Sequence, residues 1–122
     1  MITPEMIQAN WTKFLNNIDT YISGERGKKL KDFYLKYEER FVMMPASHKS
    51  QYHNCFPGGY IDHVNRVVDA ALQLDALWRN FGMIDTYTTE ELVFSAINHD
   101  LGKFGDEQNA AYIEQTDSWR RD

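Results

Sequence analysis

The sequence predicts an all-α protein, a compact bundle of about five helices, and three observations support this. Apolar residues recur at three- and four-residue steps, helix caps and glycines bound these stretches, and the β-branched residues lie inside helical patterns. Hydrophobic residues make up 43% of the 122 residues and charged residues 25%, as in an ordinary globular domain. We expect a single domain, with N-terminal helices over 1–44 and a motif-bearing part over 45–122.

Two helices are predicted in the N-terminal part. The first begins at residues 3–5, where a threonine cap precedes a proline and an acid of the first turn. Its apolar positions are Met6, Ile7, Trp11, Phe14, Leu15, Ile18 and Ile22. Gly24 and Gly27 mark a break, and a second helix is predicted from about Lys28 to Phe41, with its charged residues on a solvated face.

The third and fourth helices are predicted to form the centre of the bundle. The third begins near Gly59, runs for about 22 residues with a broad apolar face, and stops at Gly82. The fourth is capped by Thr88 or Thr89. It ends at 98–101, because a glycine follows where a left-handed C-cap residue belongs.

Two further segments have a weaker pattern. Residues 44–59 lose the helical period and are rich in histidine and aromatic residues, which favours a functional loop over a disordered one. A short fifth helix is predicted over 106–115. No segment shows the alternation of a half-buried strand.

Charge and cysteine usage restrict the classes of partner. The net charge of −5 at pH 7 excludes a basic footprint for duplex DNA or for an anionic membrane over the whole chain. A small anionic substrate would need a local cation, and a bound metal is one. Cys55 is the single cysteine, and neither a signal peptide nor an apolar membrane span is present, so we expect a cytoplasmic protein.

The four histidines are His48, His53, His63 and His99, and all lie at or near predicted helix ends or in the loop. His99 is followed at once by Asp100, and adjacent helical residues point about 100° apart. Both can reach one cation in a groove if a second helix supplies the next ligand, and His63 is the obvious supplier. Two imidazoles and a carboxylate hold a divalent ion and leave coordination positions open.

Each of these residues also has a simpler interpretation. His63 alone would more often be a half-exposed helix histidine, and His53 bonding the loop backbone is as good an interpretation as a catalytic role. Asp62 either contacts a metal ligand and helps to position it, or is simply an acidic residue in the first turn of its helix. Asp100 is disfavoured at a helix C-terminus unless something positive compensates it. A plain helical protein without a site would keep His63 and His99 far apart.

Two strings carry a resemblance to a known family. SAINHDLGKFGD, over 95–106, resembles the signature of the HD-domain metal-dependent phosphohydrolase superfamily, in which a hydrophobic helix ends in His-Asp followed by Gly-Lys. PASHKSQYHNCFPGGYIDHVNRVV, over 45–68, resembles the upstream motif of one branch, where a "YH…GG…H" run leads into the helix with the first metal histidine. That branch includes bacterial 3′–5′ exoribonuclease HD domains and small phage-encoded HD proteins.

The resemblance implies roles for five residues. His63 would be the first metal ligand, and His99 and Asp100 the doublet after which the family is named. Lys103 would contact the substrate phosphate and His53 the metal or the substrate, so that Asp100, Lys103 and His53 carry the catalytic chemistry. The implied cofactor is a divalent metal, with Mn, Fe, Mg, Co, Ni and Zn undistinguished. The implied partner is a phosphorylated small molecule or a nucleic-acid end.

The sequence departs from the family pattern at its C-terminal end. The family continues with a further aspartate on a later helix, a position that Asp106, Asp117 and Asp122 do not fit. We therefore expect an N-terminal fragment or a short protein, incomplete at its C-terminus. The alternative to a phosphohydrolase is a truncated or degenerate HD module that binds a nucleotide or a protein partner without catalysis. Apolar surface left exposed by missing helices would favour a homo-oligomer.

Overall fold

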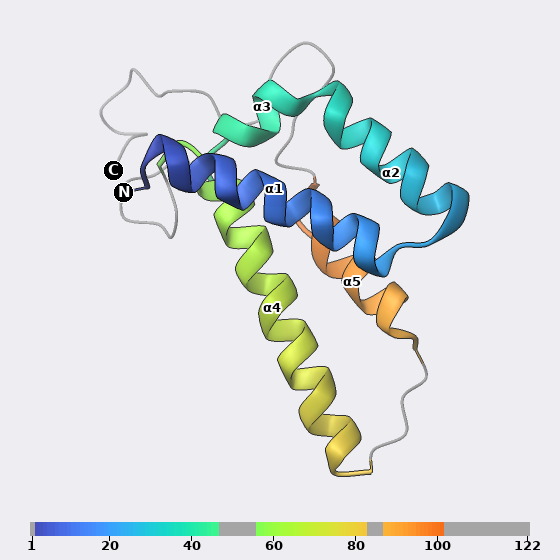
Figure 1. Cartoon of the computed structure of the whole chain (residues 1–122). Coiled ribbons are helices and arrows are strands. Elements are labelled where there is room, and N and C mark those ends of the chain that lie inside the picture. Colours follow the sequence, from blue (N-terminus) through green and yellow to red (C-terminus); the bar gives the residue numbers. More distant parts are fainter. Residues whose placement is uncertain (1, 47–55, 83–86, 102–122) are drawn as a thin grey trace.

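The computed structural model describes residues 2–46, 56–82 and 87–101, and within these ranges it is all-helical, as predicted. Five helices are present there: α1 (Pro4–Tyr21), α2 (Gly24–Lys36), α3 (Glu38–Met43), α4 (Gly59–Asn80) and α5 (Thr89–Asn98). Figure 1 shows α5 running beside α4, α1 lying across both, and α2 and α3 along the other side of α1. None of these helices is both long and apolar enough to cross a lipid bilayer.

The starts predicted from the sequence are confirmed at three helices. Thr3 accepts a hydrogen bond from the backbone N–H of Met6 at the start of α1. Helix α4 has the predicted 22 residues and begins after Gly58, whose φ of 81° is left-handed. Thr88 rather than Thr89 caps α5, and it forms a capping box in which Thr88 and Glu91 each accept from the other's backbone N–H.

The predicted start of the second helix is wrong. Helix α2 begins at Gly24, not at Lys28, and Gly27 lies inside its first turn. A Cβ at Gly27 would collide with the carbonyl oxygen of Ile22, so this glycine permits the tight return of the chain from α1. Of these two glycines, Gly24 is the one that marks a turn, with a φ of 62°.

The predicted continuity of that helix is also wrong. The backbone leaves helical geometry at Tyr37, where φ is −114° and ψ is 30°, and α3 begins at the next residue. The apolar stripe continues through the break to Phe41, which is fully buried. The apolar period therefore gives no sign of the break at Tyr37. The five helices described are thus not the five predicted: one predicted helix is two, and the predicted helix over 106–115 lies outside the described residues.

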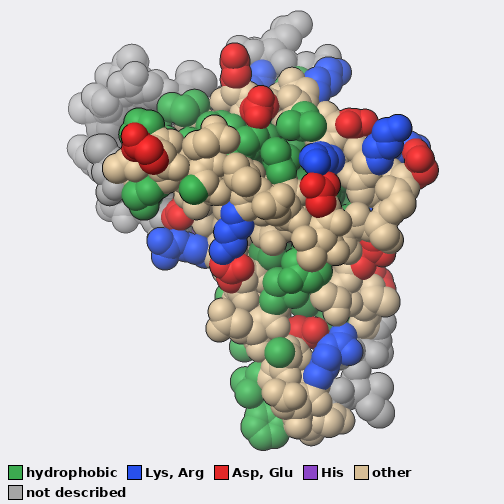
Figure 2. Space-filling view, in the orientation of Figure 1, with side chains coloured by type: hydrophobic (Ala, Val, Ile, Leu, Met, Phe, Trp, Pro, Cys, Tyr) green, Lys and Arg blue, Asp and Glu red, His purple; other side chains and the backbone are tan. Residues whose placement is uncertain are grey.

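The hydrophobic core lies where α1, the first half of α4 and α5 meet, under a layer of rings from α2 and α3. Its largest fully buried members are Phe14, Ile18, Tyr34, Phe41, Tyr60, Ile61, Val64, Val68, Val93 and Ile97. Beyond the core, α4 extends past the other helices (Figure 1), and large apolar side chains are exposed on its last turns. Figure 2 shows apolar side chains at that end of the molecule.

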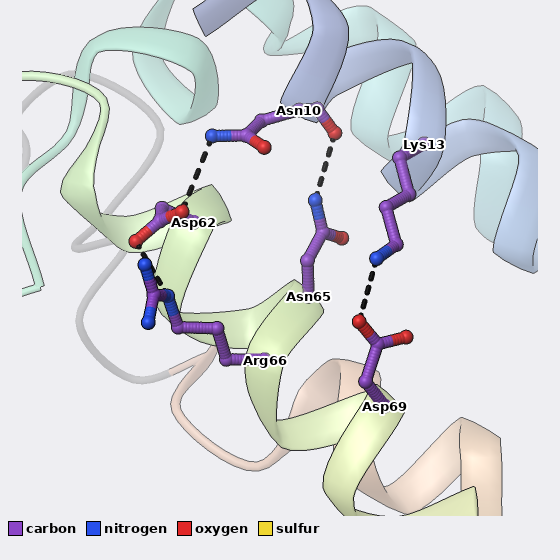
Figure 3. A network of polar contacts seen from close by, with 6 residues as sticks. All are labelled: Asn10, Lys13, Asp62, Asn65, Arg66 and Asp69. Atoms are coloured by element: carbon purple, nitrogen blue, oxygen red, sulfur yellow. Dashed lines mark hydrogen bonds and ion pairs between the residues drawn. The ribbon is translucent and has the colours of Figure 1, made fainter. Parts of the chain in front are cut away.

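A row of polar contacts sets the rotation of α4 against α1 (Figure 3). Asn65 donates to the backbone oxygen of Asn10 at 2.9 Å, and the Asn10 amide lies 3.4 Å from Asp62. Asp62 also pairs with Arg66 on its own helix, and Lys13 pairs with Asp69 one turn further on. Because this face of α4 is turned to α1, His63 points about 100° away from Asp62, toward α5.

Candidate metal centre

Three side chains that are remote along the chain meet between the start of α4 and the end of α5. The Nε2 atoms of His63 and His99 are 3.3 Å apart. Oδ2 of Asp100 lies 3.4 Å from the first nitrogen and 3.0 Å from the second. The meeting predicted for these residues is therefore present, and His63 and His99 do not lie far apart.

The separations fit ligands of a single cation. Two atoms bound to one ion at about 2.1 Å are about 3.0 Å apart at a right angle and about 3.4 Å apart at a tetrahedral angle. The three measured distances, 3.0, 3.3 and 3.4 Å, lie in that range. Because all three atoms lie on one side of such an ion, its other positions would stay open. Two imidazoles and one carboxylate could therefore hold a divalent metal here.

A backbone contact sets the tautomer of His99. Its Nδ1 lies 2.7 Å from the carbonyl oxygen of Ala96, which can only accept a hydrogen bond. Nδ1 therefore carries the hydrogen, and in the neutral ring Nε2 keeps its lone pair directed at the other two side chains. Histidines that bind metals are commonly oriented in this way, by donating their second nitrogen to a carbonyl or carboxylate.

The electrostatics of the cluster favour a positive charge at its centre. The lone pair of His99 Nε2 faces the Asp100 carboxylate at 3.0 Å, so two acceptors are in contact. Asp100 also follows the C-terminus of α5, where the helix dipole disfavours a carboxylate. A divalent cation at the centre of the cluster would relieve both conflicts. The side chains of His63, Asp100 and His99 are 22%, 27% and 32% exposed, so a ligand could reach them from solvent.

Two buried phenols lie behind the cluster, and the sequence analysis did not single them out. Burial, and then the charge of Asp100, raise the pKa of Tyr60 well above its usual value. Burial, and then Tyr60, raise the pKa of Tyr34 in the same direction. Both hydroxyls therefore stay protonated, and Tyr34 donates to the side chain of Asn98, the residue before His99. In the sequence both tyrosines are ordinary members of apolar stripes, so no signal distinguishes them.

The remaining predicted site residues lie outside the described part of the chain. These are His53 and Lys103, together with His48, Cys55 and the predicted C-cap glycine. Asp62 is described, and it bonds Asn10 and Arg66, so it holds α4 against α1 beside His63.

Comparison of the chain with protein-family models, with curated proteins and with solved structures gives no match. The resemblance to HD-domain phosphohydrolases therefore stands on the two strings of the sequence and stays a prediction.

Proposed function

We propose that the chain is a metal-dependent phosphohydrolase that acts on a nucleotide or on a nucleic-acid phosphoester. The observation that supports this most is the convergence of His63, His99 and Asp100 within 3.4 Å of one another. These are the residues that the HD-like strings single out, and they come from two helices that are separate in the sequence.

Each of the three side chains has a defined part in the proposed site. When bound, a divalent ion would supply a Lewis acid and would lower the pKa of a nearby water molecule. His99 presents a fixed lone pair, because its other nitrogen is bonded to Ala96. His63 completes the pair of nitrogen ligands from α4, and Asp100 supplies the negative charge that a divalent cation requires.

Substrate binding in this proposal depends on charge. The chain has a net charge of −5, so an anionic phosphoester would be repelled except where a local cation is held. Lys103 is proposed to neutralise a phosphate oxygen as a point charge, and His53 to contact the metal or the substrate. Both assignments come from the HD-like strings.

The test is metal content and turnover in matched variants. Purified protein is loaded with Mn²⁺, Co²⁺ or Zn²⁺, desalted and analysed for metal, then assayed with bis-p-nitrophenyl phosphate, nucleotides and short single-stranded RNA. His99→Ala and Asp100→Asn should lose the metal and reduce turnover by more than about a hundredfold, since each removes a proposed ligand. Asp19→Asn is the control, because it neutralises an exposed carboxylate of α1 that pairs with Lys31 and takes no part in the contacts between α1 and α4.

The outcomes separate the two functions considered. Unchanged metal content in His99→Ala would remove the basis for a metal site. Metal and nucleotide binding without turnover of any substrate would instead favour the module that binds without catalysis.

A further inference from the structure

A part-buried hydrogen bond between side chains joins the end of α5 to α2. The hydroxyl of Tyr34 donates to Oδ1 of Asn98 at 2.7 Å, across 64 positions of sequence. The amide nitrogen of Asn98 donates in turn to the backbone oxygen of Phe94 at 2.8 Å. Both ends of the Asn98 amide are thus bonded. The reverse orientation of the amide would set its oxygen against the Phe94 carbonyl, so chemistry selects the orientation observed.

This contact matters because Asn98 lies directly before the two proposed ligands at the end of α5. Asn98 is the last residue of α5, and the two proposed ligands, His99 and Asp100, follow it directly. The final carbonyls of a helix lack partners within the helix, and helix ends fray. A ligand pair at such an end needs support from elsewhere if it is to hold the spacing that a metal requires.

Tyr34 is well suited to give that support because its ring cannot move freely. It is fully buried, with its ring centroid 4.7 Å from that of Phe14 and 4.6 Å from that of Phe41. Rings from two neighbouring helices, α1 and α3, therefore fix the phenol, and its hydroxyl is a rigid donor.

We propose that Tyr34 is a positioning residue for the metal centre, acting through Asn98 to hold the His99–Asp100 pair in register with His63. This inference rests on the metal site of the proposed function. Tyr34 does not bind the ion. The Tyr34 hydroxyl holds Asn98, the last residue of α5, in place. The backbone that carries His99 and Asp100 therefore begins from a fixed position. Supporting residues of this kind typically change metal affinity by about 10- to 100-fold.

The experiment is a calorimetric titration of the full chain with Co²⁺, with the visible absorption spectrum of bound Co²⁺ recorded alongside. Tyr34→Phe removes only the hydroxyl and should raise the Kd for Co²⁺ by about 10- to 100-fold and alter the spectrum. Tyr60→Phe is the matched control: Tyr60 is an equally buried phenol whose hydroxyl has no hydrogen-bond partner among the described residues. Its Kd should stay within about twofold of the wild-type value, because no bond that holds a ligand is lost.

A double-mutant cycle then tests whether Tyr34 affects metal binding through Asn98. Asn98→Ala removes the other partner of the same bond, so Tyr34→Phe combined with Asn98→Ala should bind Co²⁺ about as well as Asn98→Ala alone. A Kd for Tyr34→Phe within twofold of wild type would overturn the positioning role. Equal losses in Tyr34→Phe and Tyr60→Phe would overturn it too, since general loosening of the core would then suffice. Wild-type protein that binds Co²⁺ but hydrolyses nothing counts against the hydrolase alone, so the two failures are distinguishable.

Discussion

The two halves of α4 have the same apolar period and opposite surroundings. In the first half, Tyr60, Val64 and Val68 are fully buried, and polar contacts with α1 fix the helix about its axis. In the second half, Leu74 is 56% exposed and Phe81 74%, and Asp75 forms an ion pair with Arg79 of the same helix. The candidate ligand His63 lies in the half that other helices hold, which is where a site that needs sub-ångström geometry can be kept.

Substitutions in the two halves of α4 should differ most in their effect on metal binding. His63→Ala in the first half should weaken the binding of Co²⁺ by more than about a hundredfold, because one of three ligands is lost. Trp78→Ala also removes an aromatic ring from α4, but from the second half, and should leave the Kd unchanged. Calorimetric titration of both variants checks this, and equal effects would show that α4 responds as a whole rather than through His63.

The second largest difference between the two halves of α4 should be in the free energy of unfolding that is lost when a side chain is truncated. Val68→Ala deletes two methyl groups from a fully buried position, at a cost of about 2 kcal/mol once the cavity is included. Leu74→Ala deletes more carbon atoms, yet it should cost less than about 1 kcal/mol, because half of that side chain is already in water. Urea denaturation gives both values. A larger loss for Leu74→Ala would mean that a second copy or another partner covers the second half in solution.

The smallest effect concerns the far end of α5, where Glu90 accepts hydrogen bonds from the backbone and side chain of Ser23. These bonds, with a smaller contribution from Arg26, lower the pKa of the Glu90 carboxyl below its ordinary value of 4.5. Since the folded-state pKa is the lower one, the stabilisation is present above about pH 4.5 and is lost as the pH falls through the folded-state value.

The measurement is the free energy of unfolding against pH for wild type and Glu90→Gln. The gap between the two proteins should narrow as the pH falls from about 5 to about 3, by a small amount because the bond is exposed to solvent. A gap that does not vary with pH would show that the carboxylate charge is not what Ser23 stabilises.

The sequence predicts the parts of this molecule that depend on local chemistry. The cap at Thr3, a cap at Thr88 or Thr89, and the start of α4 near Gly59 follow from residues within one turn of each other. The meeting of His63 with the His99–Asp100 pair is predictable because the motif places all three at facing helix ends.

Other features depend on contacts between distant residues, and the sequence does not show them. The break at Tyr37 interrupts no apolar period. Gly27 has the sequence character of a helix breaker, but it lies inside α2, where it allows the close approach to Ile22 as the chain returns from α1. The Tyr34–Asn98 bond joins residues 64 apart through a tyrosine that has the position of a core residue. Neither helix propensity nor the spacing of apolar residues can indicate that Tyr34 has such a partner.

The most direct test of the metal centre is X-ray absorption at the metal edge of protein loaded with one equivalent of Zn²⁺ or Co²⁺. The account predicts imidazole scattering from two histidines, with nitrogen ligands at about 2.0–2.1 Å, and the loss of one imidazole in His63→Ala. A spectrum of the wild-type protein with oxygen ligands alone would contradict it.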